Sequence, residues 1–227
     1  MRTFDLQVDS LSDLNRELQR RDGDGLETQF EVINPVGAHA VAAGLMHPID
    51  VSIKGHVGYY CAGMNQQARV EILGNAGTGV GENMMSGRIR VHGDASQSAG
   101  ATGHGGLLVI DGDAAARCGI SMKGVDVVVK GSVGHMAAFM AQAGRLVVCG
   151  DAGAHLGDSL YEADIFVRGR VESLGADCEE KALDAKTTSA LGALLRSADL
   201  DCRPEEFRRF GSARELYHFK VDNAGNY

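Results

Sequence analysis

Several features that would mark common protein classes are missing from this sequence. Its 227 residues include no tryptophan, three prolines and 5% aromatic residues. No apolar run approaches the roughly 20 residues that a membrane-spanning helix needs, and the first 21 residues lack the apolar segment of a secretory signal. We therefore expect a soluble, cytoplasmic protein without a membrane segment.

An excess of positive charge is also missing, because the formal net charge is -8 at pH 7. Proteins that bind nucleic acids need a basic surface to neutralise phosphates. The composition therefore argues against a nucleic-acid partner and against attachment to an anionic membrane.

The five cysteines form no recognisable framework. They are odd in number, widely spaced and without a C-x-x-C pair: Cys61, Cys118, Cys149, Cys178 and Cys202. This spacing favours reduced, partly buried thiols over disulfides or a zinc site.

Glycine, by contrast, is abundant and periodic, with 31 residues in the chain. Seven glycines follow one another at a constant step of 19 residues: Gly55, Gly74, Gly93, Gly112, Gly131, Gly150 and Gly169. We call them the anchor glycines and count positions within each repeat from them. Glycine or another small residue recurs three and seven positions later, which gives the pattern G-x-x-G-x-x-x-G. Such glycines allow unusual backbone angles and close approach of neighbouring segments.

The four residues before each anchor glycine have the pattern of a β-strand. Their first and third positions are Val, Ile or Leu in all seven repeats, as in "VSIK", "VEIL" and "IRVH". This alternation is typical of a strand with one buried face. The second and fourth positions are more mixed, and we expect them to face outward.

A unit of 19 residues cannot bury its apolar face alone, so the units must stack. We predict an all-β fold, a single-stranded, right-handed parallel β-helix of about seven to eight coils over residues 31–175. Residues 1–30 would form a strand and helix that cap the first coil, with Ser10 as the N-cap. Residues 176–227 would form a C-terminal tail with helices over 181–197 and in "RPEEFRRF", followed by an arm.

The stretch "GNAGTGVGENMMSG" (residues 74–87) resembles a phosphate-binding loop, but its glycines are those of the repeat. The dinucleotide pattern would require a glycine where Glu82 stands, and no helical period follows. We therefore predict a turn of the β-helix here and no nucleotide site.

Catalytic and metal-binding groups are not obvious in the repeats. No two histidines share a position within the repeat, and His135 and His155, one coil apart, are the only pair close enough to consider as a site. Cys61 and Cys118 share a position but lie three coils apart. The sequence thus predicts no catalytic residue, no cofactor site and no metal site in this chain.

Methionine and aromatic residues gather in the variable part of the repeat. Some of them must fill the core, but a small coil cannot enclose them all, and an exposed group of this kind marks a partner interface. The candidate interface residues are Tyr59, Tyr60, Met84, Met85, Met136, Phe139 and Met140.

The repeat, and segments such as "GHVGYYCAGMN" and "GSVGHMAAFMAQAG", resemble the C-terminal β-helix domain of the large subunit of glutamate synthase. The β-helix subunit of formylmethanofuran dehydrogenase is related. Over residues 30–227 the chain is most similar to free-standing versions of this domain, above all the β-helix subunit of N-methylglutamate synthases.

The resemblance implies a non-catalytic scaffold that docks an amidotransferase-like subunit and an FMN-binding synthase subunit in a hetero-oligomer. FMN, with an iron–sulfur cluster as a further candidate, would lie on a partner. The assembly would convert glutamate and methylamine to N-methylglutamate and ammonia. Alternatives are the β-helix subunit of a glutamate synthase or another amine-transfer complex, an autonomous β-helix enzyme, and a binding module outside any enzyme.

Overall fold

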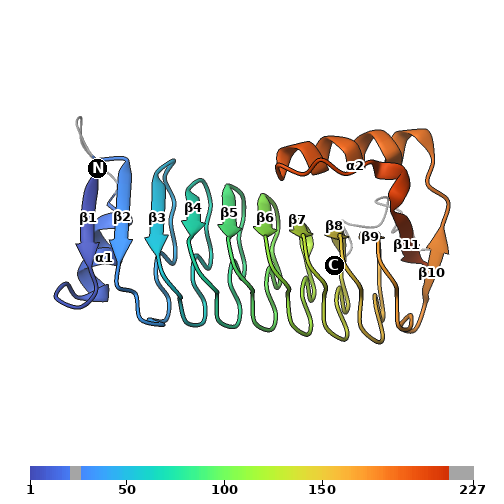
Figure 1. Cartoon of the computed structure of the whole chain (residues 1–227), viewed down its shortest axis with the longest axis horizontal. Coiled ribbons are helices and arrows are strands. Elements are labelled where there is room, and N and C mark those ends of the chain that lie inside the picture. The colour runs from blue at the N-terminus through green and yellow to red at the C-terminus, as the bar shows by residue number, and fades with distance from the viewer. Residues whose placement is uncertain (21–26, 215–227) are drawn as a thin grey trace, which may run out of the picture.

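The computed structural model describes residues 1–20 and 27–214, and it shows a row of coils that each contribute one strand to a common sheet (Figure 1). The strands of the stack are β2 (Gln29–Ile33), β3 (Asp50–Lys54), β4 (Arg69–Ile72), β5 (Arg88–Val91), β6 (Leu107–Ile110), β7 (Lys123–Val129), β8 (Ala143–Val148) and β9 (Asp164–Val167). All neighbours are parallel, and Val70 pairs with Val51 on one side and with Ile89 on the other. The predicted parallel β-helix is confirmed, whereas its right-handed winding stays a prediction.

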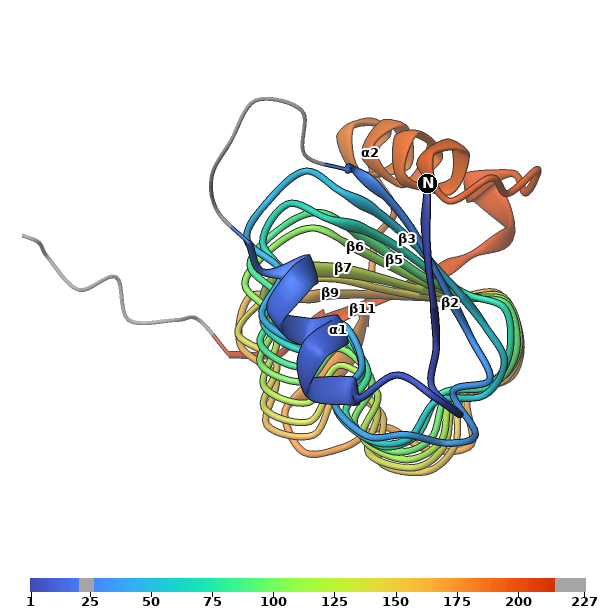
Figure 2. The same ribbon diagram turned by 90° about the vertical axis from the view of Figure 1, so that its left-hand side faces the viewer.

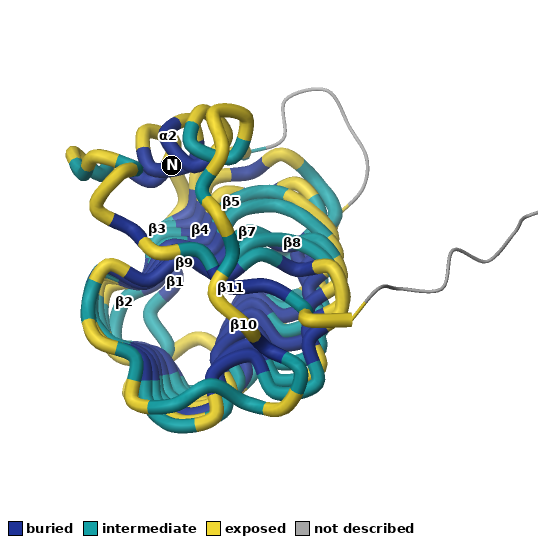
Figure 3. The backbone as a smooth tube through the Cα atoms, turned by 90° about the vertical axis from the view of Figure 1, so that its right-hand side faces the viewer, coloured by how far each residue is buried: buried dark blue, intermediate teal, exposed yellow. Residues whose placement is uncertain are grey.

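The core of the stack consists of ladders of equivalent residues from successive coils. The two apolar strand positions are buried throughout, as expected, and Figure 3 shows the inward side of the coils as a continuous buried surface. The small residues two positions after the anchor glycines form a second ladder of parallel bridges, such as Val57–Ala76 and Ala76–Ala95. Residues six and ten positions after the anchor complete the interior, with Cys118 and Met122 as examples.

The glycine columns serve two different purposes. At the anchor positions the coils stack too closely for a side chain. A Cβ at Gly131 would lie 2.7 Å from the carbonyl oxygen of Gly112 and 2.1 Å from Asp113 Oδ1. Seven positions after the anchor, Gly81 instead adopts a left-handed backbone with φ of 67°. Both properties predicted for glycine are therefore used, at separate positions of the coil.

Residue types other than glycine also adopt a left-handed backbone five to nine positions after the anchor glycine. We call this segment of each coil its corner. In the first full repeat Tyr60, Ala62 and Met64 have φ between 53° and 59°. Such angles cost roughly 1–2 kcal/mol per residue. Hydrogen bonds to neighbouring coils offset this cost, because Tyr60 N–H donates to the Thr78 carbonyl and Met64 N–H to the Glu82 carbonyl. The corner is thus held by the stack as a whole.

The N-terminal end is capped as predicted. Strand β1 (Arg2–Asp5) pairs in parallel with β2, and helix α1 (Leu11–Leu18) lies across the open end of the coils (Figure 2). Ser10 caps α1 by accepting a hydrogen bond from the backbone of Asp13, and Leu14 and Leu18 are buried. Gly23 and Gly25, which in the sequence follow the basic last turn of this helix as stop signals, lie outside the described residues.

The C-terminal end differs from the prediction of helices alone. After β9 the chain forms β10 (Cys178–Lys181), α2 (Ala185–Ser197), the short 3₁₀ helix η1 (Pro204–Glu206) and β11 (Arg208–Ser212). Pro204 does begin η1, but "RRF" is strand rather than helix. Strand β11 pairs antiparallel with β9, and β10 pairs with β11, so these two strands cover the last edge of the stack. The predicted terminal arm lies in residues 215–227, which the structure does not describe.

Helix α2 runs back along the stack and covers the outer face of its last coils (Figure 1). The second strand positions were expected to be mixed and outward-facing, but in these coils they form a second hydrophobic core against α2. This core contains Val109, Val128, Val147 and Phe166 from the strands and Leu191, Leu194 and Leu195 from α2. The prediction holds for the earlier coils, where Ser52 and Glu71 are half-buried.

Candidate interaction surface

The glycine-rich stretch at residues 74–87 is built as an ordinary turn of the stack. The backbone N–H groups of Gly77, Gly79 and Gly81 donate to the carbonyl groups of Val57, Gln97 and Cys61 in the adjacent coils. A phosphate needs such N–H groups to be free. These residues therefore do not fit a nucleotide or flavin phosphate.

The cysteine thiols are mostly buried and protonated. Burial raises the pKa of Cys61 and of Cys118 to about 12, and of Cys149 and Cys178 to about 11. Thiolates are the nucleophilic and metal-binding form, so these four thiols are poor candidates for either role.

Residues 1–20 and 27–214 contain neither a metal-binding cluster of side chains nor a membrane-spanning helix. Within these ranges no group of three or more His, Cys, Asp and Glu side chains is placed to hold a metal ion. His135 and His155 are both exposed and belong to no such group. No helix of the same ranges is long and apolar enough to cross a membrane.

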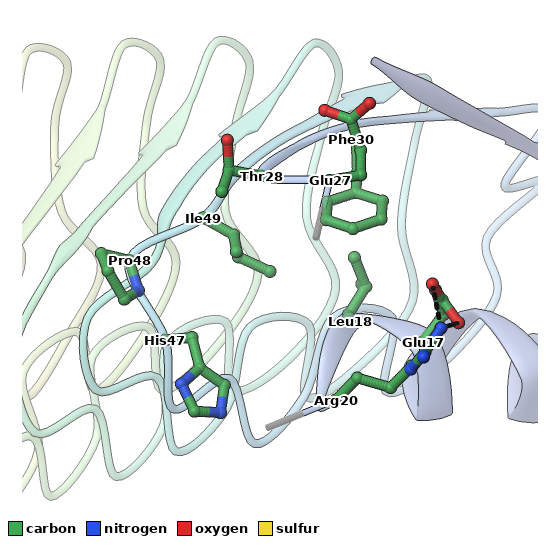
Figure 4. Close-up of a pocket in the computed structure, with 9 residues that line it drawn as sticks. All are labelled: Glu17, Leu18, Arg20, Glu27, Thr28, Phe30, His47, Pro48 and Ile49. Carbon is green, nitrogen blue, oxygen red and sulfur yellow. Dashed lines mark hydrogen bonds and ion pairs between the residues drawn. The ribbon is translucent and has the colours of Figure 1, made fainter. Parts of the chain in front are cut away.

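A pocket of about 150 Å³ lies between α1 and the first coil (Figure 4). Leu18, Phe30 and Ile49 converge in it, and its polar rim includes Glu17, which is ion-paired with both Arg20 and Arg2. The Nε2 atom of His47 is buried and has no hydrogen-bond partner among the described residues.

The charged groups on the outer face of the sheet are paired with one another and with the end of α2. Arg90 donates to both carboxylate oxygens of Asp111 at 3.0 and 3.1 Å, and to Asp199 at 2.9 Å. Lys130 lies 2.8 Å from Asp111. Burial alone would raise the pKa of Asp111, but hydrogen bonds from Arg90 and Lys130 outweigh it and lower that pKa. This network fastens α2 to the stack.

The predicted interface residues divide by exposure. Tyr59, Met85 and Met140 are exposed at 55%, 47% and 41%, as expected for an interface. Tyr60, Met136 and Phe139 are half-buried. Met84 is wrong as an interface residue, because it is fully buried in the interior ladder ten positions after the anchor. Of the adjacent pair Met84–Met85, one side chain thus points in and the other out.

Tyr59 is tied to the preceding coil. Its ring stacks on His39 with centroids 3.9 Å apart, and its backbone N–H donates to His39 Nδ1 at 3.1 Å. More than half of the Tyr59 side chain nevertheless remains open to solvent. The stack therefore presents a fixed aromatic ring beside the coil corner.

The exposed apolar residues at the corner occur in two equivalent pairs. We define a corner pair as two residues from successive coils. The first lies nine positions after the anchor glycine of its coil, and the second lies eleven positions after the anchor glycine of the following coil. Met64 and Met85 form one pair, and Met85 N–H donates to the carbonyl of Asn65, next to Met64. Met140 and Tyr161 form the other, with Tyr161 N–H bonded to the Ala141 carbonyl in the same way. Met64 and Tyr161 belong to the same group of methionine and aromatic residues in the variable part of the repeat, but they were not among the seven candidate interface residues.

The three corner pairs in between are polar. They are Asn83–His104, Thr102–Lys123 and Ser121–Gln142, and the second member of each is exposed. The exposed apolar side chains of the corner pairs therefore form two patches on one edge, the N-terminal patch (Met64, Met85) and the C-terminal patch (Met140, Tyr161). At one inter-strand spacing per coil, their four-coil offset corresponds to roughly 19 Å.

Comparison with known proteins agrees with this architecture. Residues 31–192 match the model of the family described as "GXGXG motif". The chain is 58% identical over 228 residues to "Protein GlxC" of Rhizobium meliloti (strain 1021), and the match covers all of both chains. No solved structure matches. The chain therefore belongs to the GXGXG motif family, that of the C-terminal β-helix domain of glutamate synthase, and is a glutamate-synthase-like subunit.

Proposed function

We propose that this chain is the non-catalytic scaffold subunit of an N-methylglutamate synthase. In this role it docks an amidotransferase-like subunit and an FMN-binding synthase subunit. The assembly exchanges the amino group of glutamate for methylamine, which gives N-methylglutamate and releases ammonia.

The observation that carries the scaffold role is the pair of apolar patches on one edge of the stack. Exposed methionine and aromatic side chains are enriched in protein interfaces. Two patches separated by three polar corner pairs suit two partners better than one. A stack held by hydrogen bonds between every coil keeps the two patches at a fixed separation, which is what a scaffold requires.

The cofactors are assigned to partner subunits. The N–H groups of the glycine-rich turn are engaged between coils, which does not suit a flavin phosphate on this chain. Cys61 and Cys118 lie in the interior three coils apart, which does not suit an iron–sulfur cluster. FMN and any cluster would therefore reach the assembly on its synthase subunit.

The test is purification of the assembly through an affinity tag on this chain, followed by assays of the complex. We expect a subunit with flavin absorbance and an amidotransferase-like subunit to co-purify. Methylamine should be the amine that is incorporated. Incorporation only from ammonia or glutamine would contradict the N-methylglutamate assignment while keeping the scaffold role. Activity of the isolated chain on an amine substrate would contradict the scaffold role itself.

A further inference from the structure

Two cysteines from distant parts of the sequence meet where the C-terminal segment covers the stack. Cys149 directly follows β8 and is buried, with 5% exposure. Cys202 lies in the connection between α2 and η1 and is half-buried. Both belong to the second hydrophobic core, the one that joins α2 to the outer face of the coils.

Arg168 of the following coil holds the two cysteines together. Its Nε donates to the backbone carbonyl of Cys149 at 3.1 Å, and its Nη1 contacts Cys202 Sγ at 3.3 Å. Both cysteine side chains pack in the same cluster, and the pKa of Cys149 is raised first by burial and in addition by the neighbouring Cys202 thiol. Cys202 is therefore a partly exposed sulfur that contacts a cation, and Cys149 is its neighbour on the buried side.

We propose that Cys149 and Cys202 are a disulfide-forming pair that locks the C-terminal segment to the coil stack when a peroxide or disulfide oxidant is present. The proposal does not depend on the identity of the assembly. In a reducing compartment such a bond forms transiently, in response to oxidant.

The chemistry with peroxide runs in two steps. The Cys202 sulfur, activated by Arg168, attacks one peroxide oxygen, and the O–O bond breaks to give a sulfenic acid and water. The neighbouring Cys149 thiol, which need not be a free nucleophile, then condenses with this sulfenic acid: the S–S bond forms as the S–O bond breaks, and the hydroxyl leaves as water with the Cys149 proton. In total two thiols and one hydrogen peroxide yield one disulfide and two waters.

The other three cysteines provide an internal control. Cys61 and Cys118 are fully buried in the coil interior, and Cys178, the first residue of β10, is buried against the same interior core. None of them shows a contact with another cysteine in the described structure. They should remain thiols under conditions that oxidise the pair.

The experiment treats the full-length protein with hydrogen peroxide or oxidised glutathione, then counts free thiols and maps tryptic peptides by mass. We expect the five thiols to fall to three. Peptides 146–168 and 197–208 should be recovered joined, two hydrogen atoms lighter than their sum. The bond closes a loop of about fifty residues, so the melting temperature should rise on the order of 10 °C and return on reduction.

Cys202→Ser should abolish the joined peptide and keep Cys149 free, whereas Cys178→Ser should leave the pair able to form. Because peptide mapping of the unmodified sequence needs no variant, a folding defect in either variant does not affect the result. Recovery of Cys149 as a free thiol, with Cys202 carrying glutathione or over-oxidised to a sulfinic acid, would overturn the proposal.

Discussion

Met64 and Met140 occupy the same corner of coils that lie four repeats apart, both with a left-handed backbone, φ of 56° and 53°. Each is followed by an exposed apolar side chain from the next coil, Met85 in one case and Tyr161 in the other. A strict 19-residue period turns this sequence relationship into a fixed spatial one. The two apolar patches consequently lie on the same edge of the stack, four coils apart.

The first prediction concerns the close stacking at the anchor glycines. Gly131→Ala should lower the free energy of unfolding by about 3–4 kcal/mol. The new Cβ would meet the Gly112 backbone and displace Asp113 Oδ1, which accepts a hydrogen bond from Ser132 N–H at 2.7 Å. Urea denaturation followed by circular dichroism would measure the loss.

Gly81→Ala is the matched control for this variant. Ala62 and Ala138 occupy the equivalent position in two other coils, and both have a left-handed backbone. The substitution should therefore cost about 1–2 kcal/mol, the usual cost of a left-handed backbone at a residue with a side chain. A loss at Gly131 no larger than the loss at Gly81 would argue against close approach as the reason for glycine at the anchor position.

The second prediction concerns the attachment of α2. Leu195→Ala should weaken the second hydrophobic core by about 2–4 kcal/mol, because Leu195 is almost fully buried against the outer face of the sheet. Amide hydrogen exchange across residues 185–197 should accelerate, while exchange in β4 and β5 stays slow. The exposed Lys186→Ala should change stability by less than about 0.5 kcal/mol. Unchanged exchange in α2 of the Leu195 variant would argue against this packing.

The third prediction concerns pH. The pKa of Asp111 is lowered on folding, since its hydrogen bonds from Arg90 and Lys130 outweigh its burial. A lowered carboxyl pKa contributes stability that is fully present above the unfolded value of 3.8 and is lost as the pH falls through the folded pKa. Asp111→Asn should therefore cost about 1–3 kcal/mol at pH 7 and progressively less below pH 3.8.

Urea titrations at pH 7 and pH 3 would compare this variant with Asp50→Asn, which changes an exposed carboxylate at the start of β3. The Asp50 variant should stay within about 0.5 kcal/mol of the parent at both values. A deficit of the Asp111 variant that is as large at pH 3 as at pH 7 would show that lost packing, and not lost charge, is responsible.

The stack could be predicted from sequence because its constraint is repeated in every coil. Each anchor glycine and each strand pair adds the same evidence, and Leu14 and Ser10 marked the N-terminal cap by ordinary helix rules. The interior positions six and ten residues after the anchor were harder, because Cys118 and Met122 are residue types that occur both in cores and on surfaces. Met84 was misplaced for this reason.

The C-terminal segment could not be predicted in the same way, because it repeats nothing. Strands β10 and β11 carry the charged sequences "CEEK" and "RRFGS", which suit edge strands but lack apolar alternation. A signal for the second hydrophobic core was present. Val109, Val128, Val147 and Phe166 put an apolar residue at the second strand position of four successive coils, which only a covering element explains.

The central claim is that two separate apolar patches dock two separate partners. The most direct measurement is co-purification of the partners with three double variants of this chain. They are Met64→Glu with Met85→Glu, Met140→Glu with Tyr161→Glu, and the polar control Ser121→Glu with Gln142→Glu. We expect each patch variant to weaken one partner by at least roughly 30-fold and to retain the other, and the control to retain both. Retention of both partners by both patch variants, or loss of both partners from the control, would contradict the account.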